Sequence, residues 1–198
     1  MSRIAAGEAQ AFAALFERRQ ADVFRFALHM SQSPSIAEDV TQEVFLQVMR
    51  DAGRFDPGRG GVASWLLGIA RNFVRRRFED ERGRFVPLDE QEFEREPKVA
   101  PRQDGALERL ARTERIELLR RAIVTLPLRY REAVVLCDLQ ELTYAEAASS
   151  LGCAVGTVRS RLHRGRALLA AKMMRLEGLP GVDIPDDRDR PRGVRCFA

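Results

Sequence analysis

The 198-residue sequence contains only three cysteines and two histidines. Cys137, Cys153 and Cys196 are odd in number and widely separated, which argues against a disulfide framework and fits a reducing compartment. His29 and His163 lie far apart in the sequence, and no Ser/His/Asp, Cys/His or zinc-ligand pattern surrounds them. We therefore predict that the chain is not an enzyme, holds no metal and requires no cofactor.

Long apolar runs are also missing. No stretch approaches the ~18 consecutive apolar residues of a membrane-spanning helix. The first ten residues, MSRIAAGEAQ, lack the apolar core of a signal peptide. These absences predict no membrane insertion and a cytoplasmic location. Alternating β-branched runs are missing as well, which favours an all-α fold.

The net charge of +4 is small, but it is unevenly distributed. Residues 155–175 contain six Lys or Arg and no Asp or Glu, whereas the rest of the chain is slightly acidic. Such clustering is typical of a nucleic-acid-binding site. A solvated basic helix face is the alternative that charge alone leaves open.

Helical periodicity divides the first part of the chain into three segments. Apolar spacing predicts helices over residues 8–30, 36–49 and 62–81. The stretch SQSPS breaks the first helix, and Ser35 with Glu38 has the spacing of a capping box for the second. The Gly-rich stretch DAGRFDPGRGG is predicted to be a loop.

Composition then changes, and the remainder forms a second helical unit. Residues 83–105 are Pro-rich and charged, with little periodicity, and we interpret them as a flexible linker. Helical pattern resumes at 106–175, and the Pro-, Gly- and charge-rich end at 176–198 is predicted to be a mobile tail. The expected fold is thus all-α, with two small helical domains, 1–82 and 106–175.

The last two predicted helices form a helix-turn-helix. Thr143 and Glu146 fit a capping box, Gly152 ends the first helix, and a basic helix follows from Val155. Val158, Leu162, Gly165 and Leu169 form one apolar stripe, so the other faces are available to DNA. We expect Arg164 to read bases and the flanking arginines to bind phosphates. The candidate DNA-binding residues are Thr157, Arg159, Ser160, Arg161, His163, Arg164 and Arg166.

Several motifs resemble one known family. LPLRYREAVVL, LTYAEAASSL and GCAVGTVRSRLHRGRALL resemble region 4 of the extracytoplasmic-function (ECF) sigma factors, promoter-specificity subunits of bacterial RNA polymerase. In the first half, AEDVTQEVFLQVMR and WLLGIARNFVRRRF resemble region 2. Two motif sets in the family's order make the resemblance specific. It implies that the chain binds core polymerase and recognises the −10 and −35 promoter elements.

The resemblance also assigns roles in the first domain. The helix at 62–81 and the loop at 53–61 match the family segments that bind the −10 element and accept a flipped base. The residues expected to bind this DNA are Arg71, Asn72, Arg75 and Arg76. The helix at 36–49 matches the segment that docks on the β′ clamp helices of the polymerase. Its expected docking residues are Asp39, Gln42, Glu43 and Leu46.

The resemblance implies three partners: promoter DNA, the polymerase core through its β′ clamp helices and β flap, and in some relatives an anti-sigma factor. Two rival classes remain at this stage. One is an enzyme, for which no catalytic constellation is apparent. The other is a stand-alone helix-turn-helix regulator, whose first domain would offer a ligand pocket rather than a polymerase-docking face.

Overall fold

The computed structural model describes residues 1–84 and 105–176, with side chains placed for residues 1–79 and 113–176. The predicted linker and tail fall almost wholly outside the described residues. Helices and short helical turns make up the described parts, which contain no strand, as expected for an all-α fold. In this part of the chain no helix is both long enough and apolar enough to cross a bilayer.

The first lobe, residues 1–84, holds three long helices and a short one. These are α1 (Ser2–Ala5), α2 (Ala9–Ser31), α3 (Pro34–Asp51) and α4 (Val62–Arg84), with two 3-10 turns, Ala52–Arg54 and Pro57–Arg59, between α3 and α4. The second lobe, residues 105–176, holds α5 (Gly105–Val124), α6 (Leu128–Val134), which continues as a π-helical turn (Val135–Leu139), α7 (Tyr144–Leu151) and α8 (Val155–Leu176).

Of the two capping boxes predicted from the sequence, one is present in the structure and one is not. The Thr143–Glu146 capping box is present at the start of α7, and Gly152 ends that helix with φ +61°. The capping box predicted at Ser35 is wrong, because the cap lies two residues earlier. The Ser33 hydroxyl accepts the Ile36 amide at 3.3 Å, and Pro34 occupies the first helical turn, where its missing N–H costs nothing.

The core of the first lobe lies between α2, α3 and α4. Each helix contributes one buried apolar stripe, and Phe45 of α3 also packs edge-on against the rings of Phe12 and Phe16 at 6.2 and 4.8 Å. The buried stripes comprise Val23, Phe26 and Met30 of α2, Val40, Val44, Phe45 and Val48 of α3, and Leu66, Ala70 and Val74 of α4.

The second lobe is built on a close approach of α8 to α6. Val158 and Leu162 are buried, as the helical wheel predicted. Gly165 continues their stripe at the tightest point: a Cβ there would lie 2.8 Å from Val134 Cγ2 and 3.2 Å from the Tyr130 carbonyl oxygen. Glycine is therefore required at this position by packing.

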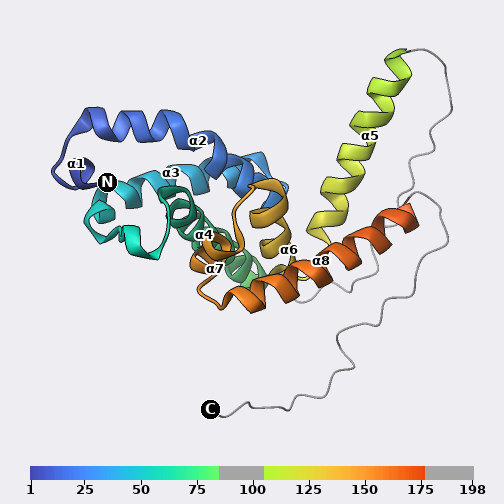
Figure 1. Cartoon of the computed structure of the whole chain (residues 1–198). Helices are drawn as coiled ribbons and strands as arrows, with labels where there is room; N and C mark the ends of the chain where they lie inside the picture. Colours follow the sequence, from blue (N-terminus) through green and yellow to red (C-terminus); the bar gives the residue numbers. More distant parts are fainter. Residues whose placement is uncertain (85–104, 177–198) are drawn as a thin grey trace, which may run out of the picture.

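The two lobes pack directly against each other, which the sequence did not predict. One continuous apolar core includes Leu66 and Ala70 of α4 together with Leu136, Ala147 and Leu151 of the second lobe. Figure 1 shows α6 and α7 beside α4, while the start of α5 and the end of α8 extend away from the first lobe. Arg131 of α6 also donates to the Met30 carbonyl at the end of α2, at 2.9 Å.

Two glycines of α8 provide a matched test of this packing. Gly165→Ala should lower the free energy of unfolding by about 1–3 kcal/mol, because Val134 is branched and the Tyr130 backbone cannot move cheaply. Gly156→Ala should raise it by up to about 1 kcal/mol, because nothing lies within 4 Å and alanine favours the helix. Urea unfolding measures both, and equal effects would contradict the packing described for Gly165.

Candidate nucleic-acid interface

The helix-turn-helix of α7 and α8 exposes a defined face of α8. Gly156, Arg159, Ser160 and His163 are all exposed and lie at helical spacing of three to four residues, so they share one face. Arg164, the expected base reader, is half-buried and has interactions of its own. Of the other candidates, Arg166 is exposed, while Thr157 and Arg161 are half-buried.

Two arginines of α8 are held in place by neighbours within the second lobe. Arg166 makes a paired contact with the Asp138 carboxylate, Nε–Oδ2 at 3.0 Å and Nη2–Oδ1 at 2.5 Å, and this contact raises the pKa of the guanidinium. The guanidinium carbon of Arg159 lies 5.7 Å from the centre of the Tyr144 ring. Both cations are thus oriented before any ligand binds.

In the first lobe, the loop before α4 and the exposed face of α4 enclose a cavity of about 320 Å³, which we call the loop cavity. Its walls include the predicted specificity loop, Trp65, and two of the expected −10 residues, Arg71 and Asn72. The second lobe closes it from the other side with Ser149, Ser150 and Gly152. The structure therefore brings the predicted loop and Asn72 together, and places a second-lobe helix over them.

The four expected −10 residues differ in accessibility. Asn72 and Arg76 are exposed, and Arg76 lies over the Phe73 ring. Arg71 is only 13% exposed and donates from Nε to Glu132 Oε1 at 2.7 Å, across the lobe boundary. Arg75 Nη1 lies 4.0 Å from the same oxygen. Glu132 is 2% exposed, so its charge is compensated by cations of the first lobe.

Helix α3 presents the expected polymerase-docking residues on one stripe. Asp39, Gln42 and Leu46 are exposed and Glu43 is half-buried. Arg77 of α4 pairs with both acids, at 3.4 Å to Asp39 and 2.9 Å to Glu43. The stripe thus combines two carboxylates held by Arg77 with an exposed leucine, Leu46, at its C-terminal end.

Sequence reasoning missed several residues of these surfaces. Met49 continues the α3 stripe: it is 58% exposed, and Leu46 is 55% exposed. Its position three residues after Leu46 could have predicted from the sequence that both side chains share one helix face. Ser64, Ser149 and Ser150 at the loop cavity carried no sequence signal, because their importance depends on how the lobes meet.

In the described parts of the chain, the side chains that could bind a metal are scattered rather than clustered. No group of three or more His, Cys, Asp or Glu there could hold a metal ion. Cys137 packs beside the apolar core, and burial is the main cause that raises the pKa of its thiol to about 11. Such a thiol is protonated at neutral pH and is a poor nucleophile.

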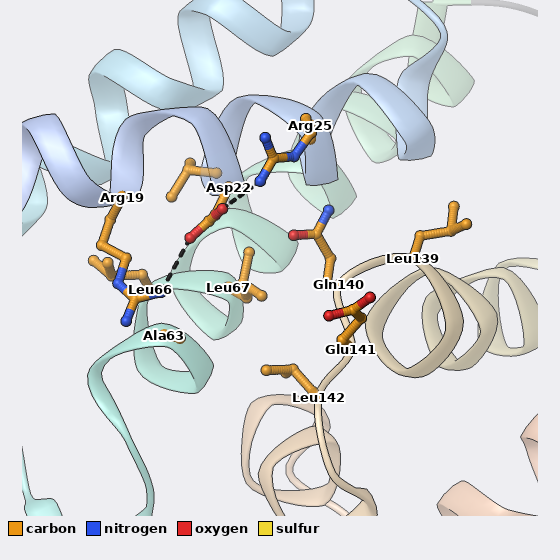
Figure 2. Close-up of a pocket in the computed structure, with 11 residues that line it drawn as sticks. Arg19, Asp22, Arg25, Ala63, Leu66, Leu67, Leu139, Gln140, Glu141 and Leu142 are labelled. Carbon is orange, nitrogen blue, oxygen red and sulfur yellow. Dashed lines mark hydrogen bonds and ion pairs between the residues drawn. The ribbon is translucent and has the colours of Figure 1, made fainter.

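A second cavity, of about 410 Å³, lies at the junction of the lobes on α2. Figure 2 shows it between α2, the start of α4 and the loop Leu139–Leu142, with Asp22 bridging Arg19 and Arg25. We call it the junction cavity. Its charged rim and apolar floor of Leu66, Leu67 and Leu142 come from both lobes.

Two family models match the chain in the order of its lobes. The model for Sigma-70 region 2 matches residues 15–84, and that for Sigma-70 region 4 matches residues 116–169. Together they cover more than half of the chain, and each lies within one lobe.

Curated relatives extend the same relationship. SigE of Mycolicibacterium smegmatis is 39% identical over 77% of this chain, which spans 58% of that protein. SigC of Mycobacterium tuberculosis is 37% identical over 84% of this chain and 85% of its own length. EcfG of Rhodopseudomonas palustris is 33% identical over 83% of this chain and 85% of its own. All three are named ECF RNA polymerase sigma factors.

Solved structures agree with the fold. The sigma factor RpoE of Bartonella quintana, in complex with the anti-sigma factor NepR, superposes with a TM-score of 0.62 at 25% identity, covering 86% of this chain and 98% of that one. CnrH, in complex with the cytosolic domain of CnrY, gives 0.61 at 26% identity, covering 86% and 92%.

Both regions and their order define a sigma factor of the sigma-70 class. The chain belongs to the extracytoplasmic-function sigma factors. The predictions of a transcription-initiation factor, and of a chain that is not an enzyme, are thereby confirmed at the level of the family.

One electrostatic feature of the lobe contact gives a pH prediction. Burial, and then the nearby charges of Arg120 on α5 and Arg25 on α2, lower the pKa of His29 below its ordinary value of 6.5. The unfolded chain therefore takes up this proton first, so the free energy of unfolding should fall as pH drops below 6.5 and through the lower folded pKa. Above 6.5 this contribution is fully present.

His29→Gln isolates the effect. Urea unfolding is measured for the wild-type and variant chains at neutral and at mildly acidic pH. Both chains contain the same carboxylates, so the effect of carboxylate titration cancels in the difference between their free energies of unfolding. The wild-type chain should lose more stability on acidification than the variant does. A wild-type-minus-variant difference that does not change with pH would refute this assignment.

Proposed function

We propose that this chain directs promoter-specific transcription initiation by docking on core RNA polymerase through α3 and by reading the −10 and −35 elements with its first and second lobes. The observation that carries the proposal is the pairing of two nucleic-acid-competent surfaces in one chain. One is the basic exposed face of α8, and the other is the loop cavity beside Asn72. A stand-alone regulator would need only the first of these surfaces.

In the second lobe, the exposure of the α8 side chains favours a different base-reading residue from Arg164, which is half-buried. Arg159, Ser160 and His163 lie on the open face with Gly156, where a glycine allows close approach of the backbone to a groove. We assign base contacts to this face and phosphate contacts to the flanking Thr157, Arg161, Arg164 and Arg166.

In the first lobe, the loop cavity is the proposed seat for a base extruded from the −10 element. Asn72 offers an amide that can pair with a base edge, and Trp65 offers an aromatic wall. Arg71, Arg75 and Arg76 are assigned to the adjoining phosphates, because Arg71 lines the cavity, Arg75 lies one turn further along the same side of α4, and Arg76 is exposed next to it in sequence.

The decisive experiment is transcription with bacterial core polymerase on genomic DNA, followed by sequencing of the transcripts. Adding the full chain should give starts that share two upstream elements at a fixed separation. If added chain yields no promoter-dependent transcript, the proposed function fails. If the chain alone protects palindromic DNA, the stand-alone regulator is favoured instead.

Two arginine variants test the α8 assignment. Arg159→Ala should relax base preference within the −35 element, at about 1–3 kcal/mol if the contact is bidentate. Arg164→Ala should weaken all promoters about equally, because a phosphate contact carries no sequence information. Transcript sequencing with each holoenzyme measures both, and the reverse pattern would restore Arg164 as the base reader.

The α3 stripe predicts a polymerase contact. Leu46→Ser with Met49→Ser should weaken binding of the full chain to core polymerase about tenfold or more, because exposed apolar anchors dominate such interfaces. Met174→Ser, which alters an exposed methionine at the end of α8, is the matched control and should bind normally. Competition for core polymerase measures all three chains, and normal binding by the Leu46→Ser, Met49→Ser chain would remove α3 from the interface.

Solved relatives support one further part of the proposal, an inhibitory partner. RpoE and CnrH were solved with NepR and the cytosolic domain of CnrY, respectively. By analogy, we assign an anti-sigma factor to the junction cavity, where one ligand can contact both lobes. We also propose a cytoplasmic location, which the scattered cysteines and the polymerase partner support.

A further inference from the structure

The loop that precedes α4 buries very little of its own surface. Of residues 52–61, which the structure describes in full, Ala52 alone is buried. The rest of the loop is exposed or half-buried, and Arg54, Asp56 and Arg59 line the loop cavity. An exposed loop keeps one conformation only where neighbouring elements hold it. The contacts that anchor this loop therefore decide where its cavity-lining side chains lie.

The first anchor of the loop is α1. Ile4 of α1 is 8% exposed and Ala52 is 3% exposed, and both belong to the same apolar core. Helix α1 packs on the 3-10 turn Ala52–Arg54, and a Cβ added to Gly53 would lie 3.9 Å from the Cβ of Ala5. Figure 1 shows α1 beside the segment that follows α3. Helix α1 thus holds the loop at its N-terminal end.

The other anchors of the loop lie nearer to α4. Phe55 packs edge-on against Trp65, with ring centroids 5.7 Å apart. The Ser64 hydroxyl donates to the Gly61 carbonyl at 2.8 Å. These contacts do not involve α1, so they remain when α1 is displaced. Loss of α1 should therefore loosen the start of the loop without unfolding α4.

Local contacts shape α1. Gly7 has a left-handed φ of +83° and turns the chain from α1 into α2. The Glu8 amide donates to the Arg3 carbonyl at 3.0 Å, and the side chains of these two residues form an ion pair. A helix of four residues is unstable alone in water, because its first turn fixes several dihedral angles for few hydrogen bonds. Helix α1 therefore depends on the burial of Ile4, which makes Ile4 the residue to test.

We propose that α1 is a brace for the loop before α4, and that Ile4 is a positioning residue for base selection in the −10 element. The functional part rests on the proposed function, because it requires that the loop cavity receives a promoter base. The family model for region 2 begins at residue 15, so the brace lies outside the matched segment. A looser loop should accept a wrong base at smaller cost, because discrimination requires cavity-lining groups that are held in place before binding.

Amide hydrogen exchange of the free full-length chain tests the brace without polymerase or DNA. Ile4→Ala removes the buried contact. Peptides covering residues 52–61 should then exchange about tenfold faster or more, because local opening of the loop requires less free energy. Exchange in α4 and in the second lobe should match the wild-type chain. Ile4→Val keeps most of the contact and should restore slow exchange.

Ile36→Ala is the matched control for Ile4→Ala. Ile36 is half-buried and packs against the same core, but it lies near the start of α3, whereas the loop follows the end of α3. Ile36→Ala should leave exchange of the loop unchanged.

Gly7→Ala is a second test variant, which leaves the core intact. Nothing lies within 4 Å of a Cβ at this position, but the left-handed φ is strained for alanine. The turn into α2 should loosen, and the loop should again exchange faster than in the wild-type chain. If Ile4→Ala loses its helicity by circular dichroism, Gly7→Ala decides the question.

Promoter selection tests the functional part. Each chain is combined with core polymerase on promoter libraries randomised at the −10 and −35 elements. Ile4→Ala and Gly7→Ala should flatten the base preference at the −10 element and leave the −35 preference unchanged. Ile36→Ala and Ile4→Val should match wild type at both elements. Equal flattening at both elements would indicate a general loss of stability and would overturn the positioning role.

The brace and the proposed function can fail separately. If Ile4→Ala and Gly7→Ala stay folded and their loops exchange like wild type, the brace is refuted, even where transcription succeeds. If their loops exchange faster and the −10 preference is unchanged, Ile4 has no positioning role. If their loops exchange faster and no chain, wild type included, gives promoter-dependent transcripts, the brace stands and the proposed function fails.

Discussion

The structure depends on helix α4 being packed on two sides at once. One stripe, with Leu66, Ala70 and Val74, is buried inside the first lobe. The other, with Ser64, Gly68, Arg71 and Arg75 at helical spacing, meets the second lobe. Two small residues at the start of this second stripe let α7 approach the backbone, and two arginines at its end meet the buried Glu132. Because the second stripe is also the proposed DNA surface, the lobe contact and DNA recognition compete for the same atoms.

Much of the fold could be predicted from the sequence because it depends on local chemistry. Apolar spacing fixes where α2, α3, α4 and α8 bury their faces, and Thr143, Glu146 and Gly152 specify the start and end of α7 through contacts within a few residues. The error at Ser35 was also local. Pro34 is well suited to a first helical turn, so the cap moved to Ser33, whereas the spacing to Glu38 alone suggested otherwise.

The candidate site was less predictable, since its residues meet across 60 to 90 positions of sequence. Arg71 was expected to be free for DNA, and nothing near it in sequence points to Glu132, 61 residues away. The contact between Ser149 and Arg59 spans 90 residues and involves a backbone carbonyl that has no sequence signature. Arg164 was expected to read bases, but it is half-buried and has interactions of its own, which the spacing of residues along α8 cannot show. Long-range packing therefore decides which of the predicted residues are accessible.

Competition for α4 implies a thermodynamic coupling between the ligands of the two lobes. A ligand that binds only when the lobes are separated must compete with the lobe contact. Its apparent affinity is its intrinsic affinity multiplied by the fraction of chains whose lobes are separated. If the proposed polymerase contact holds the lobes apart, that loss no longer applies to DNA, and polymerase binding should tighten promoter binding. By reciprocity, promoter DNA should tighten polymerase binding by the same factor. A ligand in the junction cavity, which is lined by both lobes, would bind while the lobes are in contact and oppose both. The surface of α4 can therefore couple polymerase, promoter and an inhibitory partner without any further moving part.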